Sequence, residues 1–472
     1  MCKNSHLKMR FINREQELSL LEAEYSRDGA SFVVIYGRRR TGKTTLIQQF
    51  IKNKPLKVYL FANEEAPFQQ INRFKNIIAQ IYEDKFALSI NFNSWHQLFE
   101  YLASKMTGSR NKLIFVIDEF QYLAQVDSAF PSILQQHWDS RLKFLNIMVI
   151  LSGSQMSMMY RTVLNYSSPL YGRRTAQIKL LPFDLRNTQK FFGRELDFEQ
   201  LLSIYAITGG VPKYLEFIDA DQTINDIVYN NFFNKSAFLY NEARFLLEQE
   251  FDRSTNFFSL LKIIALGANK LSEISARLQM KATSVSRYLD ILRDLQIIDR
   301  QVPVTENNPQ KSKRGIYRIK DYYLRFWFAF VYPYENYLEI GNSRYLMDNF
   351  TRKFQLYLSQ IFEEQARLLA LDYVPFPVQK IGRYWDKNVE IDIVAFNEDT
   401  SQIAFGECKW QNRPVGRNVL IDLIKKASQV QWHSGNRQEY FLVFSKTGFT
   451  GAAKAFAAER NIKLISSAEL KL

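Results

Sequence analysis

Apolar runs of strand length alternate with helix-patterned stretches over the first third of the chain. These runs are Phe32–Tyr36, Val58–Phe61, Leu113–Ile117 and Ile147–Leu151. Alternation of buried strands with helices predicts βαβ units around a parallel sheet. We therefore expect residues 1–181 to form an α/β domain.

Helical periodicity dominates the next zone and then gives way to a mixed pattern. Residues 182–250 read as helices with a break at Gly209–Pro212, which predicts a helical lid. Within residues 251–325 helices come first and short strands follow, at Phe257–Leu266, Leu271–Leu278, Thr283–Leu295, Ile297–Val304 and Gly315–Ile319. This order predicts a winged helix-turn-helix domain.

An aromatic connector over residues 326–349 leads into the last zone. Residues 350–472 open with a helix, continue through strands at Val389–Phe396 and Gln402–Trp410, and end in a further α/β pattern. We find no internal repeat and no low-complexity tract in the sequence. A second α/β domain is therefore expected at this end.

A glycine-rich loop follows the first strand. Gly37 to Thr44 has the spacing G-x-x-x-x-G-K-T between a strand and a helix, the context that a phosphate-binding loop (P-loop) requires. Its backbone N–H groups cradle phosphates, the lysine reaches the β and γ oxygens, and the threonine hydroxyl binds Mg²⁺. We expect nucleotide contacts from Gly37, Arg38, Arg39, Arg40, Thr41, Gly42, Lys43, Thr44 and Thr45.

Two acids end a second buried strand. Asp118 and Glu119 follow Leu113–Ile117, 75 residues after Lys43. We expect Asp118, with Thr44, to hold Mg²⁺, and Glu119 to polarise the attacking water. Taken alone, such a pair could equally be an acidic turn after a core strand.

Two further polar segments are candidates for the same site. Ser152 and Ser154 end the strand that starts near Ile147, where P-loop ATPases can carry a residue that senses the γ-phosphate. Arg173 and Arg174 could neutralise transition-state charge as arginine fingers. The alternatives are a turn of small residues and a solvated basic loop.

Several short motifs resemble one family in the same order. Phe11-x-x-Arg-Glu-x-Glu-Leu18, the G-R-R-R-x-G-K-T loop, Leu170–Arg174, Thr208–Leu215 and Asp321–Phe330 are similar to the archaeal-type ATPases, AAA+ relatives of the origin-recognition ATPases. The resemblance implies a P-loop AAA+ core that binds ATP and Mg²⁺, with the opening segment near the adenine. It also implies a companion C-terminal domain and allows oligomerisation through the ATPase core.

The third helix of the winged pattern carries short polar groups and a cation suited to phosphates and base edges. These are Thr283, Ser284, Ser286 and Arg287, and the wing tip adds Lys313 and Arg314. Residues 281–325 hold ten cations and five acids. We expect double-stranded DNA as the partner, with protein docking as the alternative.

Acids and a lysine share one face of the last predicted strands. Glu407 and Lys409 are two residues apart and so point the same way, and Asp392 on the adjoining strand can meet Glu407. D-x₁₄-E-x-K after a glutamate-bearing helix resembles the PD-(D/E)XK fold of restriction endonucleases, although Ile391 stands where many have proline. The resemblance implies Mg²⁺ on Asp392 and Glu407, Lys409 beside the attacking water, and Glu363 as a fourth member. An ordinary hairpin with exposed charges is the alternative.

Composition narrows the class of protein. The 472 residues are 46% hydrophobic and 23% charged, which is ordinary for a globular chain of three or four domains. Lysine and arginine exceed the acids by 62 − 48 = 14, which suits a polyanion. Two cysteines, Cys2 and Cys408, and four histidines offer no disulfide framework and no zinc spacing.

We expect no membrane partner and a cytoplasmic location. The most apolar run, Phe326–Tyr332, is too short to span a bilayer, and Met1–Arg10 lacks the apolar core of a signal peptide. The function expected is an ATP-hydrolysing AAA+ protein that binds DNA and cleaves it with a metal-dependent nuclease-like domain. The alternatives are a signal-type ATPase switch and a transcription regulator, whose C-terminal domain recognises DNA or protein without cutting.

Overall fold

The computed structural model describes residues 11–251, 255–433 and 435–470, so Cys2 and the start Met1–Arg10 lie outside the described residues. Across the described residues the chain forms two compact units. Unit 1 consists of Met1–Phe183, Val211–Glu216 and Leu246–Asp252, and unit 2 of Asp184–Gly210, Phe217–Phe245 and Arg253–Leu472. The expected lid, residues 182–250, is thus divided between the units, and most of it belongs to unit 2.

Unit 1 is built on a parallel sheet with the strand order β2-β3-β4-β1-β5. Its strands are β1 (Ser31–Tyr36), β2 (Lys57–Phe61), β3 (Leu113–Asp118), β4 (Ile147–Gly153) and β5 (Ala176–Lys179). The α/β fold with a parallel sheet, predicted from the alternating pattern, is confirmed. β1, β3 and β4 are buried along their whole length, which explains their continuous apolar runs.

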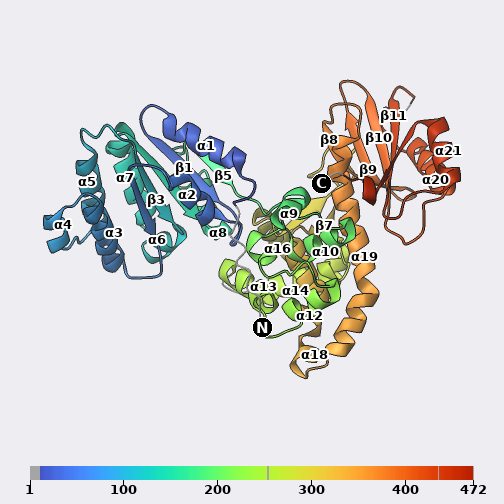
Figure 1. Cartoon of the computed structure of the whole chain (residues 1–472), viewed down its shortest axis with the longest axis horizontal. Coiled ribbons are helices and arrows are strands. Elements are labelled where there is room, and N and C mark those ends of the chain that lie inside the picture. The colour runs from blue at the N-terminus through green and yellow to red at the C-terminus, as the bar shows by residue number, and fades with distance from the viewer. Residues whose placement is uncertain (1–10, 252–254, 434, 471–472) are drawn as a thin grey trace. The chain divides into compact units, whose positions relative to one another are not determined.

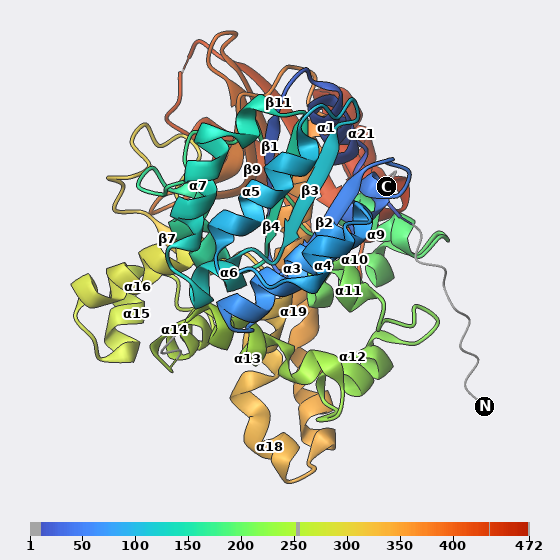
Figure 2. The ribbon, with the colours of Figure 1, turned by 90° about the vertical axis from the view of Figure 1, so that its left-hand side faces the viewer.

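Helices cover both faces of this sheet (Figure 1). They are α1 (Glu15–Ser26), α2 (Lys43–Ile51), α3 (Pro67–Ile81), α4 (Lys85–Ser89), α5 (Trp95–Met106), α6 (Gln121–Val126), α7 (Phe130–Ser140) and α8 (Met156–Met159). Leu21 of α1 and Leu46 of α2 pack with Val33 and Ile150 on one face. The other face receives α5 and α7, which lie in front of the strands in Figure 2.

The first part of unit 2 is helical. It contains α9 (Leu185–Phe191), α10 (Phe198–Thr208), α12 (Ile224–Phe232), α14 (Thr255–Ala265), α15 (Leu271–Leu278) and α16 (Ala282–Asp294). Helix α13 (Phe238–Glu250) is divided between the units, and the short α11 (Pro212–Leu215) belongs to unit 1. After α16 an antiparallel hairpin follows, β6 (Ile298–Gln301) paired with β7 (Ile316–Ile319). β6 is shorter than expected, because Pro303 has no N–H to donate to a ladder.

A long helix joins the helical part of unit 2 to its second sheet. After α17 (Tyr322–Phe330) and α18 (Glu335–Glu339), helix α19 runs for 27 residues, Ser343–Leu369. It packs against α10 and α12 and also against the strands of the C-terminal sheet (Figure 1). The helix therefore starts before the boundary expected at residue 350, and its aromatic residues anchor the connector.

The C-terminal sheet has the order β12-β11-β10-β9-β8. Its strands are β8 (Lys380–Trp385), β9 (Glu390–Asn397), β10 (Gln402–Lys409), β11 (Gln438–Ser445) and β12 (Ile462–Ser466), with α20 (Arg417–Ser428) and α21 (Gly451–Arg460) between them. β8, β9 and β10 pair antiparallel, whereas β10, β11 and β12 pair parallel. Across the described residues, no helix has the length and apolar character that crossing a bilayer demands.

Candidate functional sites

The P-loop leaves β1 at the carboxyl edge of the unit 1 sheet. Gly37 has φ 153, and a Cβ there would lie 2.3 Å from the carbonyl oxygen of Leu180, so a side chain does not fit. Gly42 has φ 94 and precedes the first residue of α2, Lys43. These glycines let the loop wrap tightly and aim N–H groups at the start of α2, where anions bind.

Lys43 lies inside this loop. Its Nζ donates to the carbonyl oxygens of Gly37, at 2.9 Å, and Arg38, at 3.0 Å. Burial lowers the pKa of Lys43 to about 8, against the opposing effect of the nearby carboxylates of Glu119 and Asp118. A buried ammonium group so close to two acids is suited to bind an added polyanion.

Asp118 meets Thr44 across the site. The Thr44 hydroxyl donates to Asp118 Oδ2 at 2.8 Å, and the Tyr59 hydroxyl donates to the same oxygen at 2.6 Å. Burial and the Asp118 charge hold the pKa of Tyr59 well above its usual value, so this phenol stays a donor. A hydroxyl and a carboxylate side by side are the hard oxygen donors that Mg²⁺ prefers, so these residues fit that ion.

Glu119 faces the end of β4. Its Oε2 accepts a 2.7 Å hydrogen bond from the Ser154 hydroxyl and another from the amide of Gln121, whose Nε2 also reaches Ser154 Oγ at 3.2 Å. Glu119 has φ 57, a left-handed conformation that is uncommon outside glycine and turns its side chain from the strand. Ser152 is fully buried, and among the described residues its hydroxyl has no hydrogen-bond partner.

The loop arginines contact tyrosines of unit 1. Arg38 Nη2 donates to the hydroxyl of Tyr214 at 3.3 Å, and Arg39 Nη2 to that of Tyr122 at 2.7 Å. Arg40 has φ 69, and Thr45 is exposed on the first turn of α2. Arg38 and Arg39 thus contact tyrosine hydroxyls, and the nucleotide contacts expected of the loop arginines stay a prediction.

The opening motif supports the loop from the side. Arg14 Nη2 donates to the carbonyl oxygens of Thr41, at 3.3 Å, and Leu181, at 2.7 Å. The Thr41 hydroxyl in turn bonds the Arg38 carbonyl at 2.9 Å. Arg14 thus ties the segment before α1 to the loop and to the residues after β5.

The two arginines expected as fingers contact neighbouring side chains of unit 1. Arg173 pairs with Asp139 at 2.9 Å, near the end of α7, and Arg174 lies over the ring of Tyr171. Both residues precede β5, whose first residue, Ala176, pairs with Val33. Their backbone therefore lies toward the amino edge of the sheet, opposite the P-loop, and their role as arginine fingers stays a prediction.

The C-terminal acids lie where β9 and β10 meet. Glu407 Oε1 accepts from Lys409 Nζ at 2.6 Å, and Lys426 of α20 approaches the same carboxylate at 3.4 Å. Asp392 Oδ2 accepts from the backbone N–H of Cys408 at 2.9 Å. Burial, then the charge of Glu407, raises the pKa of Asp392.

Glu363 joins these acids from α19. Burial, and next the charge of Asp392, raises its pKa to about 7. Within residues 11–251, 255–433 and 435–470, no group of at least three histidine, cysteine, aspartate or glutamate side chains is placed to hold a metal ion. Metal binding by Asp392 and Glu407 stays a prediction, and in this structure Lys409 and Lys426 are the cations beside Glu407.

The residues expected to contact DNA are on the surface of unit 2. Thr283, Ser284 and Arg287 on α16 are exposed, and Ser286 is half-buried. In the β6–β7 hairpin Lys313 is exposed, while Arg314 pairs with Glu306 at 2.8 Å. The elements that carry these residues follow the expected order, and their contacts with DNA stay a prediction.

Some site residues carry no local signal in the sequence. Tyr59 and Gln121 bond the two acids that end β3, and Lys426 bonds Glu407. For Gln121 the sequence offers only its place two residues after Glu119. Lys426 and Tyr59 come from other elements, so only the fold brings them in.

A parallel sheet that presents this loop, lysine and acid pair at its carboxyl edge defines a P-loop ATPase. Residues 11–218 match the family described as an ATPase domain predominantly from Archaea, and residues 327–423 match one described as archaeal and bacterial proteins of unknown function. An uncharacterised protein of Methanocaldococcus jannaschii is 32% identical over 430 residues, which are 89% of this chain and 92% of that protein. The chain belongs to this family of archaeal-type ATPases.

Solved structures of low sequence identity align with much of the chain. A Walker-type ATPase of Pyrococcus abyssi is 21% identical, with TM-score 0.46, over 67% of this chain and 95% of that one. The ORC2 protein of Aeropyrum pernix, in ADPNP and ADP complexes, is 15% identical, with TM-score 0.47, over 70% of this chain and 95% of that one.

Proposed function

We propose that this chain binds and hydrolyses ATP and uses that cycle to act on double-stranded DNA. The observation that carries the ATP half is the arrangement at the end of β3. Asp118 bonds Thr44 of the P-loop, while the adjacent Glu119 bonds Ser154 at the end of β4. The two adjacent acids therefore have different surroundings: Asp118 is placed to bind Mg²⁺, and Glu119 is placed to polarise water. Hydrolysis of a nucleoside triphosphate requires both roles.

In this proposal each residue has a distinct task. The loop N–H groups and Lys43 hold the β and γ phosphates, and Thr44 and Asp118 hold Mg²⁺, which supplies charge neutralisation when bound. Glu119 accepts a proton from water as the water oxygen bonds the γ phosphorus. The bond from that phosphorus to the bridging oxygen breaks, leaving ADP and phosphate. Ser154 is the γ-phosphate sensor, because its hydroxyl already contacts Glu119.

The test separates binding from hydrolysis. Lys43→Ala should weaken ATP binding by about 10-fold or more, whereas Glu119→Gln should bind ATP within a few-fold of wild type and lose about 100-fold in hydrolysis rate. Gln48→Ala, at an exposed position of α2, is the matched control. Equal ATPase rates for wild type and Glu119→Gln would remove Glu119 from this role.

The DNA half of the proposal is supported by charge and exposure in unit 2. Helix α16 offers Thr283, Ser284 and Arg287 to solvent, and the adjacent hairpin offers Lys313. Short hydroxyl groups and cations on an exposed helix and wing suit phosphate and base contacts. Protein docking by the same surface is the competing assignment, and it predicts binding without a strong salt dependence.

Metal-dependent cleavage of DNA is a second candidate function, favoured by the acids between α19 and β10. Glu363 and Asp392 both have raised pKa values beside Glu407 and Lys409. The strands that carry Asp392 and Glu407, β9 and β10, pair with each other, and α19, which carries Glu363, packs against both. If this centre is active, wild type cuts linear, nicked or branched DNA with Mg²⁺ or Mn²⁺, and Asp392→Ala and Lys409→Ala do not. If wild type does not cut DNA, the role of the C-terminal domain is recognition, as in a signal-type switch or a transcription regulator.

A further inference from the structure

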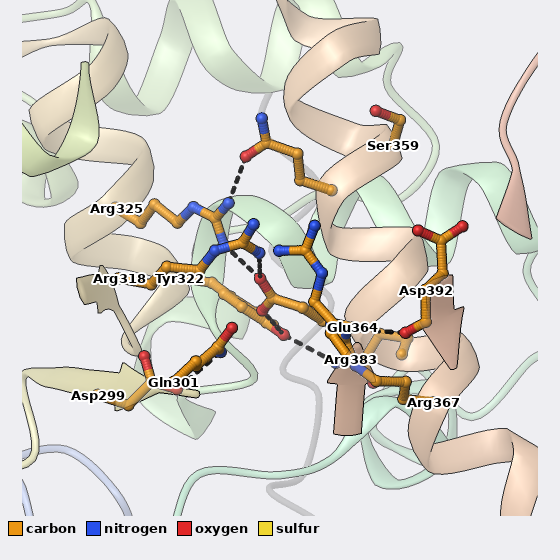
Figure 3. A network of polar contacts seen from close by, with 12 residues as sticks. Asp299, Gln301, Arg318, Tyr322, Arg325, Ser359, Glu364, Arg367, Arg383 and Asp392 are labelled. Carbon is orange, nitrogen blue, oxygen red and sulfur yellow. Dashed lines mark hydrogen bonds and ion pairs between the residues drawn. The ribbon is translucent and has the colours of Figure 1, made fainter. Parts of the chain in front are cut away.

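Arg383 stands in an irregular part of the C-terminal sheet. β8 and β9 pair regularly up to Gly382↔Val394, and the register shifts between Gly382 and Tyr384, so Arg383 lies in a bulge. A bulge re-aims the side chain that it carries. Figure 3 shows the guanidinium group of Arg383 directed from β8 toward the polar network between β7, α17 and α19.

The guanidinium group of Arg383 is buried without its full set of partners. Its side chain is 9% exposed, and Nη2 pairs with Glu390. In the described part of the chain, Nε and Nη1 are buried and donate to no hydrogen-bond acceptor. Arginine carries five N–H donors, and leaving several buried and unsatisfied is costly. An acceptor for these donors is therefore the missing element.

The neighbouring carboxylate does not supply that acceptor. Glu364 accepts from Arg325 at 2.9 Å, from Arg318 at 3.1 Å and from the Tyr322 hydroxyl at 2.8 Å. Burial opposes its charge, yet Arg325 and Arg318 hold the pKa of Glu364 at about 2, so it is a fully engaged carboxylate. In Figure 3 the guanidinium groups of Arg318 and Arg383 point toward one another beside this residue.

Arg318 and Arg383 bring two positive charges close together at this point. Burial, and then the charge of Arg383, lowers the pKa of Arg318, as expected for two guanidinium groups that face each other. Arg367 is also buried, and it donates to the backbone carbonyl oxygen of Asp392 at 3.1 Å rather than to the Asp392 carboxylate. The acids around the pair are Glu364, Glu363, Asp392, Glu390, which pairs with Arg383, and Asp299 on β6.

We propose that Arg383 and Arg318 form a binding site for a phosphate oxyanion of a nucleic acid backbone, next to the acids Glu363 and Asp392. A phosphate presents several oxygens to the planar forks of two arginines, which a water molecule cannot do. The inference rests on the proposed binding of nucleic acid, and it names where unit 2 would hold the backbone.

The position of Arg318 makes a nucleic acid the source of the phosphate. Arg318 lies on β7, the strand that leads away from the exposed wing residues Lys311 and Lys313. The same segment docks on the bulge, because the Val304 N–H donates to the Arg383 carbonyl at 2.9 Å. The segment that carries the exposed wing cations therefore leads to Arg318 and also contacts the bulge at Arg383.

The experiment uses the full chain saturated with Mg²⁺ and a non-hydrolysable ATP analogue, so that the P-loop is occupied. Inorganic phosphate is titrated calorimetrically, and a labelled DNA duplex is titrated over a range of salt concentrations. Arg383→Met and Arg318→Gln are compared with Lys380→Met, which removes an exposed charge from the same strand. Arg383→Lys, which keeps the charge and loses the fork, serves if Arg383→Met does not fold.

We expect wild type and Lys380→Met to bind phosphate, and Arg383→Met to lose that binding. Duplex affinity should fall about 10-fold in Arg383→Met, with a log–log salt slope smaller by about 1, while Lys380→Met changes it less than about 3-fold. Unchanged phosphate binding in Arg383→Met overturns the site. If Arg383→Met loses phosphate binding but binds the duplex as tightly as wild type, a nucleic acid is not the source of the phosphate.

These outcomes are distinct from failure of the proposed function. If wild type binds no duplex, the proposed action on DNA fails, and the nucleic acid assignment fails with it. The phosphate titration then tests only whether Arg383 and Arg318 bind phosphate. Cleavage is not used as a readout, so an inactive acid centre does not affect the result.

Discussion

Glu119 is held by two donors in the nucleotide site. A carboxylate that is to take a proton from water needs a free lone pair, and the Ser154 hydroxyl and the Gln121 amide both bond Oε2. Oε1 therefore remains the oxygen for water, while the bonds to Oε2 fix the direction of the group. In the proposed mechanism the contact of Ser154 with Glu119 also positions that carboxylate, whereas Ser152, two residues away, makes no such contact.

The serine assignment can be checked by a matched pair of variants. Ser154→Ala should reduce the ATP hydrolysis rate about 10-fold, which corresponds to ~1.4 kcal/mol in the barrier, with little change in ATP affinity. Ser152→Ala should leave the rate unchanged, because its buried hydroxyl donates to none of the described residues. A larger loss in Ser152→Ala than in Ser154→Ala, measured by steady-state kinetics, would reverse the assignment.

Glu363 makes the stability of unit 2 depend on pH. Its pKa is about 7 in the folded chain and about 4.5 as an ordinary glutamate, so the folded state holds the proton more tightly. Burial of the charge therefore costs stability above about pH 7, and that cost is relieved as the pH falls toward 4.5. Wild type should thus lose about 1–3 kcal/mol of stability between pH 5 and pH 8 relative to Glu363→Gln.

Urea unfolding of wild type and Glu363→Gln at both pH values checks this dependence. The difference between the two proteins is the informative quantity, because other titrating groups act on both. A constant difference across the range would mean that Glu363 ionises normally. Glu364→Gln is a poor control, since that residue bonds Arg325 and Arg318 and its loss should destabilise unit 2 at every pH.

At the scale of elements, α16 and the β6–β7 hairpin offer cations of unequal availability. Arg287 and Lys313 are exposed, and neither has an ion pair within the residues that the structure describes. Arg314 pairs with Glu306, and Arg293, at the far end of α16, pairs with Asp290. The free cations should therefore neutralise phosphates more effectively than the paired ones.

The salt dependence of DNA binding tests this difference. Arg287→Ala combined with Lys313→Ala should weaken duplex binding and reduce the log–log salt slope by up to about 2. Arg293→Ala, on the same helix, should leave the slope unchanged. If the double variant binds DNA with the wild-type slope, α16 and its hairpin do not contact the backbone, and a protein partner is the better assignment.

At the scale of the whole molecule, the chemistry is divided between the two compact units. The P-loop, Asp118 and Glu119 belong to unit 1, and Glu363, Asp392 and Arg383 to unit 2. Glu250, near the end of the unit 1 segment Leu246–Asp252, accepts from the backbone N–H groups of Met156 and Ser157 just after β4. Hydrogen bonds therefore link the segment just after β4, next to Ser154, to the end of α13.

Nucleotide binding should protect unit 1 directly. A non-hydrolysable ATP analogue at 100 times its Kd stabilises the binding-competent state by about 2.7 kcal/mol. Hydrogen exchange should slow in peptides covering α2 and β4, and less in peptides covering β9. Lys43→Ala is the control and should lose the protection, and equal protection of β9 and α2 would contradict the division of binding between the units.

The parts of the site that the sequence predicts are those made by contiguous residues. The P-loop depends on Gly37, Gly42 and Lys43, whose backbone conformations and spacing are local. The common face of Glu407 and Lys409 follows from the two-residue period of a strand. In both places the predicted residues do lie together in the fold.

Tertiary structure decided the rest, because those contacts join elements that are far apart along the chain. Strand order and helix packing determine three such features. They bring Ser154 to Glu119, bring Lys426 to Glu407 and place Arg173 at the edge of the sheet opposite the P-loop. The arginine pair of β7 and β8 depends on a bulge that no local pattern signals. Sequence periodicity determines which face of an element a residue occupies, whereas the partner on the other side is set by how the elements pack.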